Sequence, residues 1–172
     1  MDAITIRRGN LEDLPVAADY WNAIVKEAWN EDWDRRYPNW RPMFLGLARK
    51  KMAQGLQRFY VADASGEVVG VAGAQVGEAF FGAVRGYVEG VYVLPPFRRR
   101  GVASRLMREC IDWLQSMACD AVRLQSTTEG RPLYEALGFV PTGEMELRLN
   151  AAKRSFAEAY GANLRTSASR PE

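Results

Sequence analysis

Apolar residues recur along the chain with two spacings: they alternate with polar residues in short runs and return every three or four residues in longer runs. Alternation predicts strands, and the longer spacing predicts amphipathic helices. Strands are predicted at residues 3–7, 59–63, 68–75, 87–93, 121–125 and 145–149. Helices are predicted at residues 13–28, 42–54, 104–117 and 131–137, with one more around Phe156 and Tyr160.

Turn and capping residues separate these runs. Ser65 and Gly66 lie between two strand runs and predict a hairpin turn. Two prolines end the strand at 87–93, because proline cannot extend a central ladder. Asp13 is the expected N-cap of the first helix. The segment 29–40 is aromatic and acidic without a clean period, so we expect a loop or a short helix on the surface.

The order of these elements predicts the fold class. Antiparallel strands come first and a strand–helix–strand crossover follows, which indicates an α/β (α+β) fold in one domain at residues 1–150. Residues 151–172 are expected to form a C-terminal extension, a short helix followed by a polar tail. The apolar face of the helix at 104–117 consists of Leu106, Met107, Cys110, Leu114 and Met117.

Composition narrows the class of protein. The 172 residues are 48% hydrophobic and 26% charged, as in a globular domain large enough to bury a core without disulfide or metal staples. A net charge of +2 gives no reason to expect nucleic acid as a partner, and no apolar stretch is long enough to predict a membrane span or a signal segment. Cys110 and Cys119 have no partner pair for a zinc site, so we expect reduced thiols in a cytoplasmic protein.

The chain contains no histidine, which excludes several kinds of site. A Ser-His-Asp triad, a Cys-His pair, a His-ligated zinc and an imidazole proton shuttle all need that side chain. Acid–base chemistry must therefore come from carboxylates, Tyr, Lys, Cys or water.

The stretch Val93-Leu94-Pro95-Pro96-Phe97-Arg98-Arg99-Arg100-Gly101-Val102-Ala103-Ser104 joins a buried strand to a helix. The first N–H groups of a helix are unpaired, and its dipole attracts anions. Gly101 and Ala103 leave those amides accessible, and three arginines add forked donors, so this segment suits a pyrophosphate. A solvated arginine run that caps a helix remains the alternative. The spacing excludes a P-loop and a dinucleotide fingerprint, and the run lacks the interleaved aromatics of a single-strand-binding surface.

The pattern Val93-x-Pro95-x-x-Arg98-x-x-Gly101-x-Ala103 resembles the acetyl-CoA signature of the GNAT superfamily of N-acetyltransferases. Downstream, Leu133-Tyr134-Glu135-Ala136-Leu137-Gly138-Phe139 resembles the second landmark of that family, a Tyr followed by Gly-Phe. The two motifs occur in the family's order, about 30 residues apart, with a helix and a strand between them. The resemblance covers roughly residues 87–149.

This resemblance implies a mixed, mostly antiparallel sheet of six or seven strands with about four flanking helices. It implies acetyl-CoA as cosubstrate and no metal. The pantetheine arm would lie in a gap beside the strand at 87–93, against the backbone of Val91 and Val93. The residues that would hold the diphosphate are Arg98, Arg99, Arg100, Gly101, Val102, Ala103 and Ser104. Two positions depart from the family's pattern: Ala103 stands where Gly is commoner, and Thr128 stands where many members carry an Asn that binds the pantetheine arm.

The resemblance also implies catalytic roles. Tyr134 matches the family's tyrosine and would protonate the departing thiolate, while the backbone N–H of Val93 would stabilise the oxyanion. Glu89 would act as the general base, since similar Glu-x-x-Tyr-Val-x-Pro segments of diamine and aminoglycoside acetyltransferases hold a glutamate near the acceptor amine. Alternation places it on one strand face with Tyr87, Val91 and Val93. The alternative is that Glu89 pairs with an arginine such as Arg123.

The resemblance further implies that the first two helices and the loop between them form one wall of the acceptor cleft. Carboxylates and aromatic rings gather there, a combination that suits a cation: Glu27, Glu31, Asp32, Asp34, Trp29, Trp33, Tyr37 and Trp40. A solvated acidic surface with anchoring tryptophans is the alternative. The sequence thus favours an acetyl-CoA-dependent N-acetyltransferase of a small, cationic amine such as an aminoglycoside, with antibiotic resistance as a consequence, or a polyamine. A protein lysine or N-terminal acetyltransferase and a non-catalytic acyl-CoA-binding domain remain alternatives, and a homodimer is expected by analogy.

Overall fold

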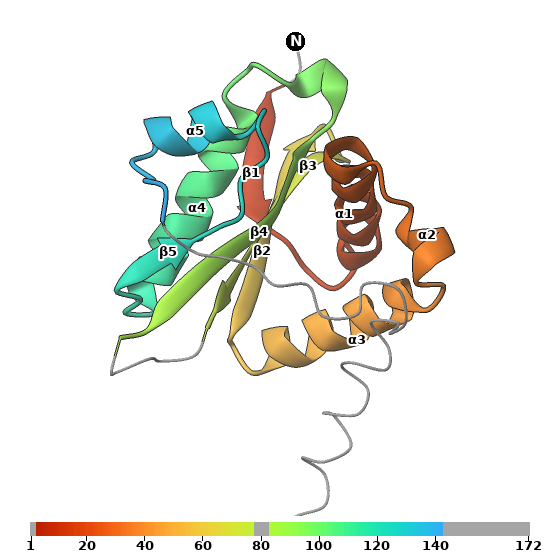
Figure 1. The fold of residues 1–172 in the computed structure, drawn as a ribbon, viewed down its shortest axis with the longest axis horizontal. Coiled ribbons are helices and arrows are strands. Elements are labelled where there is room, and N and C mark those ends of the chain that lie inside the picture. Colours follow the sequence, from red (N-terminus) through yellow and green to blue (C-terminus); the bar gives the residue numbers. More distant parts are fainter. Residues whose placement is uncertain (1–2, 78–82, 143–172) are drawn as a thin grey trace, which may run out of the picture.

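A twisted sheet with helices on both faces organises the chain (Figure 1). The computed structural model describes residues 3–77 and 83–142. The strands are β1 (Ile4–Arg8), β2 (Gln57–Ala64), β3 (Glu67–Val76), β4 (Arg85–Val93) and β5 (Ala121–Arg123). The helices are α1 (Leu14–Trp29), α2 (Trp33–Arg36), α3 (Trp40–Ala53), α4 (Val102–Ser116) and α5 (Arg131–Ala136), with a 3₁₀ turn at Pro95–Phe97.

The strands lie in the order β1-β2-β3-β4-β5. The first four are antiparallel neighbours, and β5 pairs with β4 in parallel after the crossover through α4. The predicted α/β (α+β) class and its crossover are therefore confirmed. The described residues hold five strands where six or seven were predicted. The predicted strand at 145–149, the helix around Phe156 and Tyr160 and the extension at 151–172 lie outside the described residues.

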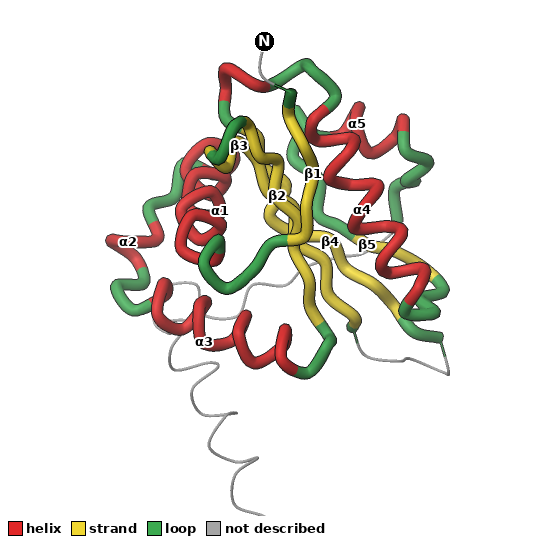
Figure 2. The backbone as a smooth tube through the Cα atoms, turned by 180° about the vertical axis from the view of Figure 1, so that it is seen from behind, coloured by secondary structure: helices red, strands yellow, loops and turns green. Residues whose placement is uncertain are grey.

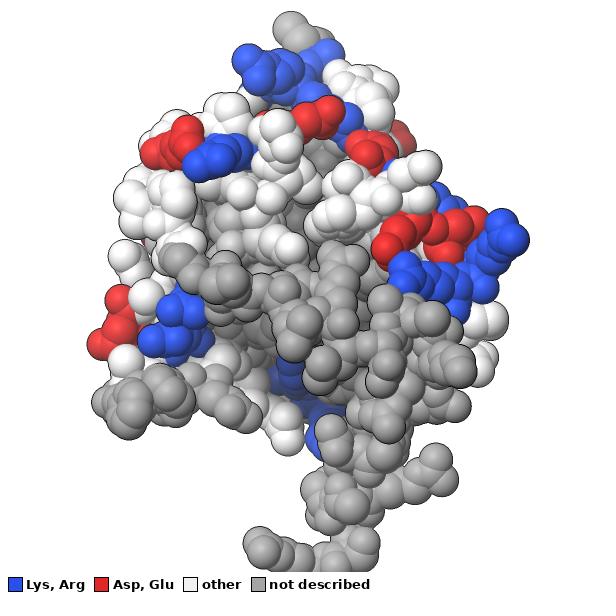
Figure 3. All heavy atoms as spheres, viewed as in Figure 1, with Lys and Arg blue, Asp and Glu red and all other residues white. Residues whose placement is uncertain are grey.

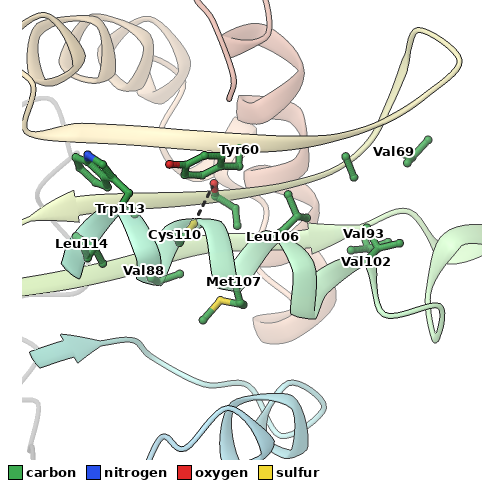
Figure 4. Close-up of a cluster of buried hydrophobic side chains, with 13 residues drawn as sticks. Tyr60, Val69, Val88, Val93, Val102, Leu106, Met107, Cys110, Trp113 and Leu114 are labelled. Carbon is green, nitrogen blue, oxygen red and sulfur yellow. Dashed lines mark hydrogen bonds between the residues drawn. The ribbon is translucent and has the colours of Figure 1, made fainter. Parts of the chain in front are cut away.

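Helix α4 covers one face of the sheet, whereas α1 and α3 cover the other (Figure 2). The face of α4 that packs on the sheet is fully buried along its length (Figure 4): Val102, Leu106, Met107, Cys110, Trp113 and Leu114. The pattern identified the middle of this face; it missed Val102 at one end and Trp113 near the other, where Met117 is half-buried. The Cys110 thiol donates to the carbonyl of Ala72, and burial raises its pKa, so this cysteine is a packing residue.

Several local predictions need correction. Asp13 is the N-cap residue of α1, as predicted, but its carboxylate accepts hydrogen bonds from Arg7 and from the N–H of Asn10 and makes no capping bond to the helix. The α4 helix begins at Val102, two residues earlier than predicted, because Gly101 adopts a left-handed conformation (φ 72°) that opens it directly. The segment 29–40 does hold a short helix, α2, but Trp40 is buried rather than on the surface.

The predicted facing of β4 is wrong. Gly90 has a φ of 64°, and the register with β3 shifts at this point, so β4 carries a bulge. Glu89 lies on the α1 and α3 side, where it contacts Gln57 and Gln75. Beyond the bulge, Val91 and Val93 belong to the cluster under α4, and Tyr92 belongs to the cluster under α1. Tyr87, Glu89, Val91 and Val93 therefore do not share one face.

Candidate active site

A cleft of about 1030 Å³ opens between α1 and α2 on one side and β4, the loop before α4 and α5 on the other. Nearly all the site residues that we predicted from the sequence line this cleft. Those that line it are Glu89, Val91, Val93, Arg98, Arg99, Gly101, Val102, Ala103, Ser104, Thr128 and Tyr134. Arg100 is not among them, since its guanidinium lies over the ring of Phe97, 5.7 Å from the centroid.

The cleft runs beside an unpaired part of β4. Strand β5 pairs only with the first three residues of β4, from Arg85 to Tyr87, so the rest of that edge has no strand neighbour among the described residues. The N–H of Leu94 points to β3, where it donates to Val69, and the carbonyl of Val93 accepts instead from the Arg98 side chain at 2.8 Å. Because the N–H and C=O of one strand residue point to the same edge, the N–H of Val93 faces away from β3.

The N-terminus of α4 forms one end of the cleft. The first hydrogen bond within the helix runs from the N–H of Arg105 to the carbonyl of Gly101, which leaves the preceding amides without a helical acceptor. A Cβ placed on Gly101 would meet nothing within 4 Å, so open space lies over these amides. Arg99 is exposed, has a φ of 61° and lines the cleft beside them. This arrangement fits a diphosphate.

Tyr134 extends from α5 into the cleft and is half-buried. Its ring packs edge-on against Phe139, the aromatic residue of the same motif, with centroids 6.1 Å apart. Burial raises the pKa of its phenol, so the hydroxyl stays protonated at neutral pH. No described residue hydrogen-bonds to this hydroxyl, which leaves it free to donate to a bound group.

Thr127 holds the start of α5, and sequence reasoning missed it. Its hydroxyl accepts from the N–H of Gly130 at 3.1 Å, and its carbonyl accepts from the N–H of Arg131. Thr128, which the sequence did select, is exposed and lines the cleft. Thr127 lies four residues before α5 and three before its N-cap residue, Gly130, so the usual capping pattern did not indicate this contact.

Glu89 lines the same cleft from β4 and is half-buried. The side-chain amide of Gln57 donates to Oε1 at 3.3 Å, and that of Gln75 donates to Oε2 at 3.1 Å. Both partners are neutral amides rather than the arginine considered from the sequence. Burial raises the pKa of Glu89 to about 7, although the positive charge of Lys51 acts in the opposite direction. A carboxyl with this pKa can accept a proton near neutral pH.

The family model described as "Acetyltransferase (GNAT) family" matches residues 11–139. The chain belongs to this family. It is 24% identical to aminoglycoside N(6')-acetyltransferase type 1 of Salmonella typhimurium over 72% of this chain and 86% of that protein. It is 28% identical to glucosamine 6-phosphate N-acetyltransferase of Trypanosoma brucei brucei, over 59% of this chain and 69% of that one. A predicted acetyltransferase from Clostridium acetobutylicum, solved with acetyl-CoA, has the same fold, with a TM-score of 0.72 and 17% identity over 86% of this chain and 97% of that one.

In this GNAT acetyltransferase, an ionic cluster joins the two walls of the cleft. Glu27 of α1 accepts from the Tyr92 hydroxyl at 2.7 Å and from the Arg98 guanidinium at 2.8 Å. Arg98 also lies over the Tyr92 ring, 5.3 Å from its centroid. Burial opposes ionisation of Glu27, but the two hydrogen bonds outweigh it and hold the pKa of Glu27 below its usual value. Burial and the Glu27 carboxylate raise the pKa of Tyr92 to about 12.

The predicted acidic and aromatic wall is only partly present. Glu27, Trp29 and Trp33 line the cleft, and Trp21, which sequence reasoning missed, joins them. The other three carboxylates have partners on or near α2, where acidic and basic side chains intermingle (Figure 3). Glu31 pairs with Arg36, Asp32 caps α2 and lies near Lys26, and Asp34 accepts from Asn22 and Trp40.

Two absences concern the described residues alone. Residues 3–77 and 83–142 contain no cluster of His, Cys, Asp and Glu that could hold a metal ion. Within the same residues, no helix is both long and apolar enough to cross a membrane.

Proposed function

We propose that this GNAT acetyltransferase moves an acetyl group from acetyl-CoA directly to a primary amine of a small cationic molecule, with an amino sugar of the aminoglycoside kind as the leading candidate. The observation that carries the proposal is the wall opposite β4, where Glu27 lies among Trp21, Trp29 and Trp33. Flat aromatic faces bind ammonium groups, and a carboxylate accepts their hydrogen bonds. The names of two relatives support an amino sugar, since one refers to aminoglycosides and the other to glucosamine 6-phosphate.

The mechanism follows from the groups along the cleft. Glu89 accepts the proton of the attacking amine, directly or through one water, while the N–H of Val93 donates to the oxyanion as the C–N bond forms. Tyr134 then donates its proton to sulfur as the C–S bond breaks, so the products are an amide and CoA thiol. The amides at the start of α4, with Arg99, hold the diphosphate. Arg98 acts mainly by shaping the loop, because its guanidinium binds Val93 and Glu27.

The test is an acceptor panel read by thiol release. Aminoglycosides, glucosamine phosphates, polyamines and lysine-containing or N-terminal peptides are compared at saturating acetyl-CoA. The proposal predicts the highest kcat/KM for an amine with a cationic sugar ring. Turnover of peptides alone would instead identify a protein acetyltransferase. Binding of acetyl-CoA without turnover of any acceptor would favour a non-catalytic acyl-CoA-binding domain.

A further inference from the structure

A chain of polar side chains runs from helix α3 to Glu89. The ammonium of Lys51, near the end of α3, donates to Oε1 of Gln75 on β3. The amide nitrogen of Gln75 donates to Oε2 of Glu89 at 3.1 Å, and Gln57 of β2 donates to Oε1 of Glu89. The sheet register creates the cluster, because Gln57 stands opposite Gln75 and Glu89 stands opposite Gly73, two residues before Gln75 on β3.

Lys51 fixes the orientation of the side-chain amide of Gln75. An ammonium group has donors and no acceptor, so the atom of Gln75 that faces it must be the carbonyl oxygen. The amide nitrogen of Gln75 must therefore point to Glu89. Lys51 is half-buried, whereas its neighbour Lys50 is exposed on the same helix.

The amide on the other side of Glu89 is not fixed in this way. The Oε1 atom of Gln57 is buried and has no hydrogen-bond partner among the described residues. Gln57 also lines a small cavity of about 20 Å³, together with Trp21, Phe59 and Glu89. This volume is enough for about one water molecule. Gln57 can therefore turn its oxygen or its nitrogen toward Glu89, as the protonation state of the carboxyl requires.

The charges around Glu89 come mostly from one direction. From α3, Lys51 supplies a positive charge; α1 contributes Trp21, β2 contributes Gln57 and β3 contributes Gln75, none of which titrates near neutral pH. On its own strand, Tyr87 stands two residues before Glu89 and lines the cleft, and Tyr92 lies toward α1 beyond the bulge, where it donates to Glu27 of α1. Lys51 is thus the charged group of the polar chain that ends on Glu89.

We infer that Lys51 is a positioning residue that acts through Gln75 to keep Oε2 of Glu89 a hydrogen-bond acceptor and to stabilise the carboxylate. The proton taken from the acceptor amine then goes to Oε1, beside Gln57 and the small cavity. The inference rests on the proposed role of Glu89 as the base. Lys51 itself touches no reacting atom; its effect is on the acidity and the proton-bearing oxygen of another side chain.

The test measures Glu89 directly. Protein carrying glutamate labelled with ¹³C at the side-chain carboxyl is titrated by NMR, with Glu89→Gln used to assign the signal. Loss of the charge in Lys51→Met should raise the titration midpoint of Glu89 by about half a pH unit to one unit. Lys51→Arg should restore it, and Lys50→Met should leave it unchanged. Gln75→Leu should raise the midpoint with Lys51 still present.

Activity is read beside the titration. The acidic limb of the kcat/KM profile should move with the NMR midpoint in each variant. An unmoved midpoint in Lys51→Met, or an equal shift in Lys50→Met, would overturn the inference. Full activity of Glu89→Gln would instead remove the proposed base, while the NMR midpoint would still decide whether Lys51 controls the carboxyl. Thermal unfolding of each variant shows whether it is folded, and Lys51→Arg keeps the test decisive if Lys51→Met unfolds.

Discussion

Glu27 lies 2.8 Å from the guanidinium of Arg98, so one ion pair ties α1 to the loop that precedes α4. Arg98 in turn binds the carbonyl of Val93, at the end of the strand that borders the cleft. Arg98 therefore joins the loop proposed for the diphosphate to the wall proposed for the acceptor by one hydrogen bond, and to the end of β4 by another. The pair is partly exposed, and such pairs contribute little to the stability of the fold.

Replacing Glu27 by Gln should weaken the binding of the acceptor while leaving the protein folded. The carboxylate is the acidic group on the proposed acceptor wall, so KM for a cationic acceptor should rise about tenfold, with KM for acetyl-CoA changed much less. Steady-state kinetics with both substrates varied measures the two constants. Glu31→Gln is the matched control, because Glu31 pairs with Arg36 and does not line the cleft. Equal effects of the two substitutions would contradict the assignment.

Removing the Tyr134 hydroxyl should slow the chemical step. Its phenol faces the cleft and stays protonated, so Tyr134→Phe should lower kcat by about 10²-fold or more, while acetyl-CoA still binds. The two quantities are measured by thiol release and by calorimetric titration with CoA. Tyr37→Phe serves as the control, because Tyr37 packs on Trp33 and does not line the cleft. An unchanged kcat for Tyr134→Phe at every pH would exclude its role as the acid.

Gly101 offers a test of the diphosphate site. Gly101→Glu places a carboxylate over the amides of α4, so the affinity for acetyl-CoA should fall about tenfold or more. Gly55 is a close match, because it has a φ of 71° and open space around its Cα. Both substitutions should cost about 1 kcal/mol for the left-handed conformation. Isothermal titration with CoA should distinguish them, and similar CoA affinities would remove the site from this loop.

Glu89 should also make the stability of the fold depend on pH. Its pKa rises from 4.5 to about 7 on folding, so the folded state binds a proton that the unfolded state has released. The contribution of Glu89 to the free energy of unfolding is therefore fully present below about pH 4.5 and is lost as the pH rises through 7. The free energy of unfolding of Glu89→Gln, taken relative to wild type, should rise by about 3 kcal/mol between pH 4 and pH 8. Urea unfolding at a series of pH values measures this difference, and parallel curves for the two proteins would contradict it.

Sequence reasoning succeeded where the determining interactions are local. The motif from Val93 to Ser104 carries its own turn, glycine and helix start, so its place beside the cleft followed from a dozen neighbouring residues. The partners of Glu89 come from β2 and β3 and depend on strand register, which no local pattern specifies. Trp40 is buried because it packs between other aromatic rings and donates to Asp34, which again depends on folding.

The bulge in β4 is an intermediate case. A single glycine inside a strand pattern is a known sign of a bulge, so Gly90 held the information that the alternation breaks. The sequence did not indicate how closely helix α1 packs against the strand at this point. A Cβ on Gly90 would lie 1.5 Å from the indole nitrogen of Trp21, which shows how closely α1 approaches the strand.

The extra residue at the bulge in β4 decides which of the later side chains face the site. With it, one strand presents Glu89 and Tyr92 toward α1, and Val91 and Val93 toward α4. If the same residues paired with β3 without the bulge, every side chain after Glu89 would turn to the opposite face, which would send the Tyr92 ring to the α4 layer and Val93 to the α1 layer. Such a chain could keep each residue that the motif requires and still lose the site. A change that abolishes the bulge while keeping every residue should therefore disturb the site more than most substitutions on this strand.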